Sequence, residues 1–499
     1  MVEIIKERIN YIFIVTITFV FGFIGHGYIY LNGIFSHDAS RIFQNDFSFQ
    51  ISLGRFLQPI YLWFRGYISA PFLIGIISLS FLSLAICVIV KIFNIKKASS
   101  IILLCAILSI NATISLGNAS YMPWSDIYML SFFLSTVAVY SYINVKKYGF
   151  IITILCIVIV CGLYQPYFAS IVALFIIYEI ICIMNNENNK KIISDGIKEI
   201  ATLLIGLLVY YLVLNIVLKI TGVSLSDGSN SINGVGTFRD ISLIQLIINT
   251  YKYFAHSFIR PITYHHNFCG LINIMIFILI ISRVIFIVKN RKLSISNSVL
   301  LFVSLMILPL GFNIIYFISK GSVHELVTYS FYLVYLFAII LIDDLDKHSV
   351  TKKIQIFLLF LLVLNNIIYS NQLYLKKDLE FKSTLSVMTR VIDRIEQTEG
   401  YEVGVTPIAI VGELNSSALS VKRFGFSEIV GIGVDDFGSY STTYDLTYYW
   451  YFSEILGYPV TLLSGYEFKN LSEVVEMDVF PSSNSVKMVN GVVVVKLSY

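Results

Sequence analysis

Four charged residues crowd into one short stretch that directly follows a long apolar run. The stretch GIFSHDASRIFQNDFSFQISLGRF, residues 33–56, contains Asp38, Arg41, Asp46 and Arg55. A carboxylate can take a proton as a general base, and a guanidinium can stabilise charge that develops on a phosphate oxygen. Charged groups beside hydrocarbon are costly and often mark function. A solvated loop whose ions pair locally is the alternative, and the residue types leave both interpretations open.

Similar polar residues recur at the ends of later apolar runs, where a substrate could be bound. In chain order they are Arg65, Asp126, Tyr164, Gln165, Arg260, Lys320, His324 and Glu325. Glu325 is a better candidate than most of these because it lies where an apolar run begins. His265 and His266 could bind a metal, but adjacent histidines without further ligands at a defined spacing are more often ordinary loop residues.

The composition predicts a membrane protein with many spans. Of 499 residues, 57% are hydrophobic and 13% are charged, and the mean hydropathy is +0.79. Soluble globular proteins carry about 25% charged residues. The net charge of +4 is modest, and the basic residues lie between apolar runs, so we expect no nucleic-acid partner. The six cysteines lie in or beside apolar runs, without the spacing of a metal site or a disulfide framework.

Apolar runs of suitable length predict about eleven transmembrane helices. We place them near residues 9–31, 70–93, 98–116, 127–145, 149–165, 167–184, 201–221, 269–288, 297–318, 327–342 and 354–370. The alternate connections that are rich in Lys and Arg fall on the side of Lys6 and Arg8, which the distribution of positive charge assigns to the cytoplasm. The other connections, expected outside, are residues 32–69, 117–126, 222–268 and 319–326.

The predicted transmembrane domain therefore covers residues 1–370, with outer loops at 32–69 and 222–268, and an odd number of spans sends 371–499 outside. Apolar residues at helical spacing predict an amphipathic helix over 374–396. The segment PIAIVGE (407–413) predicts a buried strand, and SVKMVNGVVVVKLS (485–498) predicts a hairpin that turns on Asn490-Gly491. We expect a small soluble α/β domain at this end of the chain.

Three segments carry a resemblance to a known family. They are LGRFLQPIYLWFRG (53–66), GLYQPYF (162–168), and LEFKSTLSVMTRVIDRIEQ with PIAIVGEL (within 379–414), and an acid precedes them soon after the first span. Together they resemble the Gtr type II family of bacterial O-antigen glucosyltransferases. Members of that family look like C-type glycosyltransferases, with a GT-C-like fold. The resemblance implies that a sugar moves from a polyprenyl-phosphate lipid to a surface polysaccharide outside the cytoplasm.

The family usually shows two neighbouring acids in the first outer loop, whereas this chain has His37-Asp38. Asp38 takes the second acidic position, so the resemblance implies Asp38 as a single general base in an inverting displacement. No cofactor is required by this scheme, and a divalent metal remains possible but is not favoured. The expected phosphate-binding residues are Arg55, first by resemblance, then Arg65, Arg260, Lys320 and His324. Sugar-binding candidates are Tyr164, Gln165 and Glu325, and His37, Arg41, Asp46 and Asp126 complete the expected substrate site.

The leading hypothesis is a glucosyltransferase of the bacterial inner membrane. It would use undecaprenyl-phosphate sugar as donor and O-antigen or another lipid-linked glycan as acceptor, on the periplasmic face. A polysaccharide polymerase is the first alternative, because the outer loop 222–268 is long. A transporter or lipid flippase is the second, but it would need ionisable residues deep within spans. The middles of the predicted spans are nearly free of Asp, Glu, Lys and Arg.

Overall fold

The structure is a computed structural model that divides into two compact units. The residues it describes are 2–35, 37–43, 46–226, 242–262, 268–321, 323–343, 345, 348–414, 426, 428–431 and 448–498. Within them, side chains are not described for residues 2–10, 37, 40 and 41. Unit 1 consists of residues 1–31, 45–117 and 124–371, and unit 2 consists of residues 32–44, 118–123 and 372–499.

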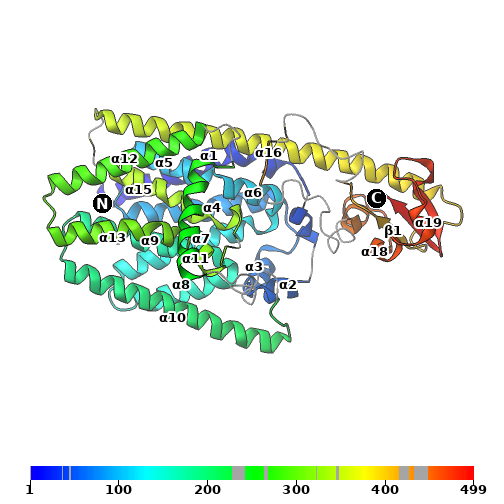
Figure 1. Ribbon diagram of the computed structural model, residues 1–499, viewed down its shortest axis with the longest axis horizontal. Helices are drawn as coiled ribbons and strands as arrows, with labels where there is room; N and C mark the ends of the chain where they lie inside the picture. The colour runs from blue at the N-terminus through cyan, green and yellow to red at the C-terminus, as the bar shows by residue number, and fades with distance from the viewer. Residues whose placement is uncertain are drawn as a thin grey trace. The chain divides into compact units, whose positions relative to one another are not determined.

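Unit 1 is a bundle of long apolar helices (Figure 1). An α-helix satisfies its own backbone hydrogen bonds, so apolar runs of this length can lie in hydrocarbon without unpaired N–H or C=O groups. The helices, of which α6 and α16 continue into unit 2, are α1 (Val2–Leu31), α4 (Pro71–Ile92), α5 (Ala98–Ser109), α6 (Ala112–Ser120), α7 (Ser125–Asn144), α8 (Gly149–Tyr164), α9 (Phe168–Met184), α10 (Asn189–Thr221), α11 (Leu243–Ile259), α12 (Phe268–Asn290), α13 (Ile295–Phe312), α14 (Ile314–Ile318), α15 (Leu333–Asp343) and α16 (Val350–Glu396).

Nine helical stretches of the described chain are long and apolar enough to cross a membrane. The predicted number of about eleven is therefore not confirmed. The stretch Gly149–Met184 counts once, although it contains α8 and α9, which the 3₁₀ turn Gln165–Tyr167 separates. The predicted span at 327–342 falls in the shorter apolar helix Tyr329–Asp343. Proline has no N–H and a fixed φ, so Pro166 suits the start of this turn.

Part of the predicted outer loop 222–268 is helical, as α11 (Leu243–Ile259) shows. The Ser242 hydroxyl accepts a hydrogen bond from the backbone N–H of Gln245 and caps α11. Four buried residues follow at a spacing of four: Leu246, Thr250, Phe254 and Phe258. They place one face of α11 against α12 and α13. The sequence interpretation missed this helix because only one of its faces is apolar.

Unit 2 combines the C-terminal end of α16 with a four-stranded sheet of order β2-β1-β4-β3. The strands are β1 (Ile408–Val411), β2 (Leu462–Leu463), β3 (Val486–Val489) and β4 (Val492–Lys496). Strand β1 is parallel to β2 and β4, and β3 pairs antiparallel with β4. The predicted strand and hairpin are both present, and the hairpin turns where Asn490 and Gly491 have positive φ, as a two-residue turn requires.

The core of unit 2 lies between α16 and the sheet. Apolar residues at helical spacing on α16 pack against both strand and loop side chains, and this cluster includes Met388, Val391, Ile395, Ile410, Phe452, Phe480 and Val493. The remaining short elements of this unit are a π-helical turn (Tyr451–Ile455), α18 (Gly465–Phe468), α19 (Ser472–Val475) and a 3₁₀ turn (Ser483–Ser485). Within the predicted amphipathic segment 374–396, residues from Val387 to Ile395 place an apolar face against the sheet, whereas Leu375 is exposed.

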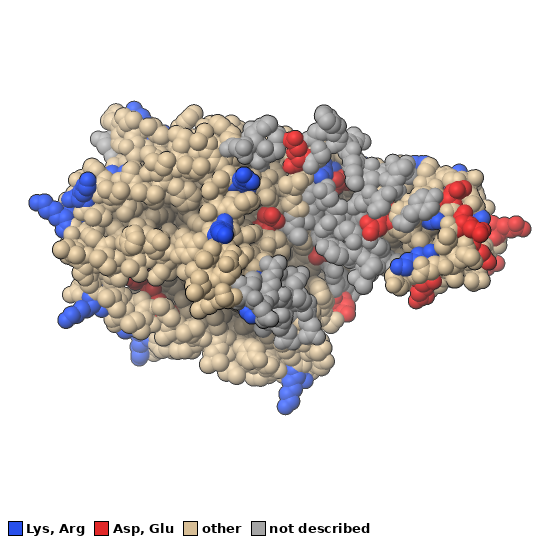
Figure 2. Space-filling model, viewed as in Figure 1, with Lys and Arg blue, Asp and Glu red and all other residues tan. Residues whose placement is uncertain are grey.

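Charge is sparse on the face of unit 1 that Figure 2 shows. Several Lys and Arg side chains project from its left end, where α12 and α13 are joined in Figure 1. That connection contains Arg291 and Lys292. The broad middle of the face carries few charged side chains, as expected for helices that cross hydrocarbon.

Candidate functional site

Two segments that carry the family resemblance pack against each other in unit 1. The segment 53–66 contributes α3 (Gln58–Arg65), and the segment 162–168 lies at the end of α8. The backbone N–H of Leu57 donates to the carbonyl of Gly162 at 2.9 Å, and the Gln58 side-chain amide donates to the carbonyl of Leu163 at 2.8 Å. A Cβ at Gly162 would lie 3.0 Å from the Leu57 side chain, so glycine permits this close approach.

The turn before Arg55 is fixed by hydrogen bonds from two other helices. The Gln165 amide donates to the Leu53 carbonyl at 2.8 Å and to the Tyr210 hydroxyl at 3.2 Å. The Tyr210 hydroxyl in turn donates to the Gly54 carbonyl at 3.0 Å. Gly54 has a φ of 82°, a conformation that favours glycine. The predicted sugar ligand Gln165 is thus engaged in positioning the backbone at Arg55.

Arg55 lies over the ring of Tyr164, with 4.8 Å between the guanidinium carbon and the ring centroid. Its Nε atom is buried and has no hydrogen-bond partner among the described residues. A guanidinium stacked on an aromatic ring keeps its N–H edge available. This geometry brings together the predicted residues Arg55, Tyr164 and Gln165 and presents a cation without an ion pair in the described part of the chain.

His324 lies close enough to Arg55 for the guanidinium charge to affect its pKa. Burial, and secondarily the charge of Arg55, lower the pKa of His324 to about 4. Its Nδ1 atom is buried and, within the described residues, lacks a hydrogen-bond partner. Near neutral pH His324 is therefore an uncharged imidazole, able to donate from one ring nitrogen and accept at the other. Arg55 supplies the positive charge of this cluster.

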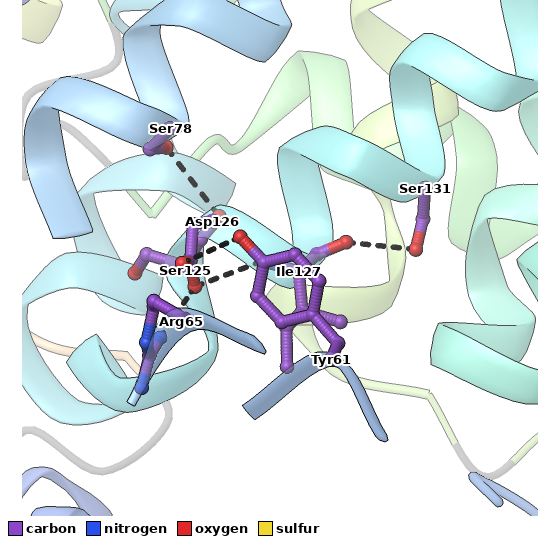
Figure 3. Close-up of polar contacts among 7 residues, drawn as sticks. All are labelled: Tyr61, Arg65, Ser78, Ser125, Asp126, Ile127 and Ser131. Atoms are coloured by element: carbon purple, nitrogen blue, oxygen red, sulfur yellow. Dashed lines mark hydrogen bonds and ion pairs between the residues drawn. The ribbon is translucent and has the colours of Figure 1, made fainter. Parts of the chain in front are cut away.

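Arg65 and Asp126 form a second, closed cluster, which Figure 3 shows. A guanidinium nitrogen of Arg65 lies 2.7 Å from one carboxylate oxygen of Asp126, and the Tyr61 hydroxyl donates to the other at 2.8 Å. The backbone N–H of Ile127 also donates to Asp126, at 3.0 Å. The side chains of Arg65 and Asp126 are 2% and 0% exposed. Burial and the charge of Asp126 raise the pKa of Tyr61, which keeps its hydroxyl proton.

This cluster joins α3 to the start of α7, because Tyr61 and Arg65 lie on one face of α3 and Asp126 lies in the first turn of α7. Tyr61 and Arg65 are four residues apart, a spacing that places both on one face of a helix. The sequence interpretation could have used this signal and did not. The contacts of Arg65 and Asp126 are those of a buried ion pair that holds α3 in place. Both residues were predicted to bind substrate, and that role stays a prediction.

Asp38 belongs to unit 2, in the 3₁₀ segment His37–Phe43. Its side chain is half-buried. Three residues before Asp38, the Tyr451 hydroxyl donates a hydrogen bond to the Phe35 carbonyl at 2.8 Å. The Phe35 ring also packs edge-on against Phe381 of α16, with 6.0 Å between centroids. The side chains of the predicted neighbours His37 and Arg41 lie outside the described residues.

Buried lysines on α16 were missed by the sequence interpretation. Lys377 is 2% exposed and lies 3.6 Å from a carboxylate oxygen of Glu380, while Lys376 donates to the Ile429 carbonyl at 3.1 Å. Lys377 and Phe381 are one helical turn apart and share a face of α16. A charged residue on an amphipathic helix normally faces water, so the sequence gives no signal of this burial.

The remaining predicted residues lie in several places. Asp46 is exposed and accepts hydrogen bonds from the N–H and hydroxyl of Ser48 at the start of α2 (Ser48–Ser52), and these bonds lower the pKa of Asp46. Arg260 is exposed at the end of α11. Glu325 follows His324, and Lys320 lies between α14 and His324.

No group of three or more His, Cys, Asp or Glu side chains that could hold a metal occurs in the described chain. His265 and His266 lie outside the residues that the structure describes.

The family model for glucosyl transferase GtrII matches residues 27–343. This region contains Asp38, Arg55, Tyr164 and His324, whereas the third resembling segment, within 379–414, lies beyond the match. Neither a curated protein nor a solved structure matches the chain. The matched region covers more than half of the sequence and includes both segments that pack around Arg55. The chain therefore belongs to the GtrII glucosyl transferase family.

Proposed function

We propose that this glucosyltransferase takes its sugar from a polyprenyl-phosphate lipid, such as undecaprenyl phosphate. The acceptor is a hydroxyl group of O-antigen or a related surface polysaccharide. The observation that carries the proposal is Arg55, a guanidinium held over Tyr164 without a carboxylate partner among the described residues. A lipid-linked sugar phosphate needs such a cation where its phosphate departs.

The proposed reaction is a direct displacement. The oxygen of the acceptor hydroxyl attacks the anomeric carbon as the bond from that carbon to the phosphate oxygen breaks. The electron pair of the broken bond leaves with the polyprenyl phosphate, and the hydroxyl proton passes to the carboxylate of Asp38. Attack from the face opposite the leaving group inverts the configuration at the anomeric carbon. Asp38 acts as the general base, since a carboxylate within reach of the hydroxyl can remove its proton.

Arg55 stabilises the departing phosphate in this scheme. Its planar guanidinium can donate two parallel N–H bonds to phosphate oxygens, which a lysine cannot do. The neutral imidazole of His324 adds a donor without adding charge. With Arg55 and His324 both donating to the phosphate oxygens, the reaction needs no metal ion. We therefore expect transfer to continue when divalent ions are chelated.

The reaction is proposed to occur on the periplasmic face of the bacterial inner membrane. The positive connections described above, among them Arg291 and Lys292, then face the cytoplasm together with the N-terminus. Residues 372–499 lie in the periplasm in this orientation. The family and the apolar helices support a membrane-bound transferase, and the distribution of Lys and Arg supports the orientation.

The first test is transfer by the purified full-length chain in lipid nanodiscs. Synthetic polyprenyl-phosphate glucose and acceptor glycan are supplied, and donor consumption and glycan product are measured for wild type, Asp38→Asn and the surface control Glu473→Gln. We expect a loss of at least roughly a hundredfold in Asp38→Asn, the usual range for removing a general base, and none in the control.

Two results would contradict the proposal. Full transfer by a folded Asp38→Asn variant would remove the general-base role. No turnover by folded wild type with any of several polyprenyl-phosphate sugars would remove the donor class. Products that grow by many repeats, instead of gaining one branch, would identify a polymerase.

A further inference from the structure

A polar cavity of about 470 Å³, open to solvent, lies at the surface of unit 2, between the C-terminal end of α16 and strand β3. Its lining residues are Arg394, Gln397, Thr398, Glu399, Ser483, Val486, Lys487 and Met488. Six of these eight carry hydrogen-bonding side chains, and two are apolar. The volume falls in the range of small-molecule sites, roughly 300–1,000 Å³. Nothing in the proposed chemistry at Asp38 or Arg55 uses this cavity.

Two cations face the cavity from different elements. Arg394 belongs to the last turn of α16, and Lys487 belongs to β3. Neither side chain makes an ion pair or a hydrogen bond within the described residues. Glu399 lines the same cavity, and within the part of the chain that the structure describes it forms no ion pair with either cation. Other basic residues of this unit are engaged: Lys496 donates to three carbonyls, and Arg390 lies over the Phe480 ring.

The backbone on both sides of the cavity is fixed by the core. Val391 and Ile395, which flank Arg394 on α16, are fully buried against the sheet. On the other side Lys487 is paired with Val494 of the central strand β4. Because the backbone of these walls is already held, binding of a ligand needs to order only the side chains. The arrangement is therefore that of a preformed site for a polar ligand.

We propose that this cavity binds a saccharide, namely a segment of the acceptor glycan, an assignment that rests on the proposed transferase function. Saccharides present many acceptor oxygens, and acidic or phosphorylated sugars add negative charge. Arg394 and Lys487 donate to these oxygens, and Glu399 accepts from sugar hydroxyls. Val486 and Met488 offer an apolar surface to the C–H face of a pyranose ring. A peptide partner would need larger apolar anchors than these two side chains provide.

The test uses the full-length chain and the double variant Arg394→Ala/Lys487→Ala. Polysaccharide is released by mild acid from the host's lipopolysaccharide, labelled with a fluorophore, and titrated with protein while its anisotropy is measured. We expect binding to weaken by roughly tenfold or more, which corresponds to about 1.4 kcal/mol, because the variant removes two charged hydrogen-bond donors. Lys469→Ala is the matched control, since Lys469 lies over Tyr466 and does not line the cavity.

Transfer kinetics supply the second readout. The double variant should raise KM for the acceptor by a similar factor while kcat is retained. Hydrolysis of the donor in the absence of acceptor should not change. A structural defect would instead lower kcat and donor hydrolysis. Both side chains reach solvent, so we expect the double variant to fold, and elution from a sizing column checks this.

The outcomes separate this inference from the proposed function. Wild type that binds the polysaccharide through Arg394 and Lys487, yet transfers no sugar, would sustain the saccharide site and overturn the transferase proposal. Equal binding by wild type and the double variant would overturn the site. So would an equal loss in Lys469→Ala, or no binding by folded wild type.

Discussion

The guanidinium of Arg65 and the carboxylate of Asp126 meet at 2.7 Å with both side chains almost completely buried. Arg65 ends the short helix α3, and Asp126 begins the long helix α7. Taking two charges out of water is expensive, and their attraction offsets the expense only where further hydrogen bonds complete the geometry. Tyr61 and the Ile127 N–H add two such hydrogen bonds to Asp126 here. The pair therefore fixes where α3, and the Arg55 turn that precedes it, lie on the bundle.

Removing one member of this ion pair should destabilise the protein strongly. Asp126→Leu leaves Arg65 without its carboxylate, and we expect a loss of about 3–5 kcal/mol in the free energy of unfolding. The double variant Arg65→Met/Asp126→Leu removes both charges and should recover most of that loss. The stabilities of the single and double variants are compared by thermal unfolding in detergent, measured as the fraction of protein that stays monodisperse. Losses that simply add in the double variant would contradict the assignment.

Arg55→Lys should lower transfer although the positive charge is kept. Lysine lacks the planar guanidinium that stacks on Tyr164, and cation–π contacts of this kind contribute about 0.5–2 kcal/mol. We expect kcat/KM for the donor to fall by roughly tenfold, which corresponds to about 1.4 kcal/mol. Arg55→Ala should fall further.

The ring of Tyr164 provides the comparison for that prediction. Tyr164→Phe keeps the aromatic face under Arg55, whereas Tyr164→Leu removes it. The leucine variant should therefore lose more activity than the phenylalanine variant. Equal losses in the two variants would show that stacking does not position Arg55.

The sequence predicts the elements of this fold better than the contacts between them. Apolar runs have a length and a period, so most of the long helices, the β3–β4 hairpin and the amphipathic part of α16 could be predicted. The contact of Leu57 with Gly162 could not, because residues separated by so much chain meet only through the packing of whole helices. The resemblance drew attention to both segments without showing that they touch.

Residue types suggest the members of the candidate site but not how deeply each side chain is buried. Arg55 and His324 were chosen by residue type, and their mutual influence depends on a burial that residue type does not encode. Lys377 is a charged residue on an amphipathic helix, where exposure is the usual outcome. Arg65 and Asp126 were chosen by residue type as well, and the burial of their ion pair could not be predicted from residue types alone.

Tyr451→Phe should slow the reaction without abolishing it. The Tyr451 hydroxyl holds the Phe35 carbonyl, three residues before Asp38. Losing a single hydrogen bond of this kind costs about 0.5–1.5 kcal/mol, so we expect kcat to fall by up to roughly tenfold as the segment loosens. Tyr448→Phe is the matched control, because the Tyr448 hydroxyl bonds to the 412–414 backbone instead. Both variants should lose similar stability, and a similar loss of kcat in both would contradict the positioning role of Tyr451.

His324 should make the protein less stable as the pH falls below neutral. Its pKa is about 4 in the folded protein and 6.5 as the ordinary value, so the unfolded chain binds a proton more readily. The contribution is fully present above pH 6.5 and is lost progressively as the pH falls to about 4. At about 1.4 kcal/mol per pH unit the whole loss approaches roughly 3 kcal/mol. His324→Gln should flatten this acid side of the stability profile, measured as the change in Tm between pH 7.5 and 4.5. Arg55→Gln, which removes the second cause of the lowered pKa, should flatten it partly. An unchanged acid-side slope in His324→Gln would show that His324 titrates alike in the folded and unfolded chain.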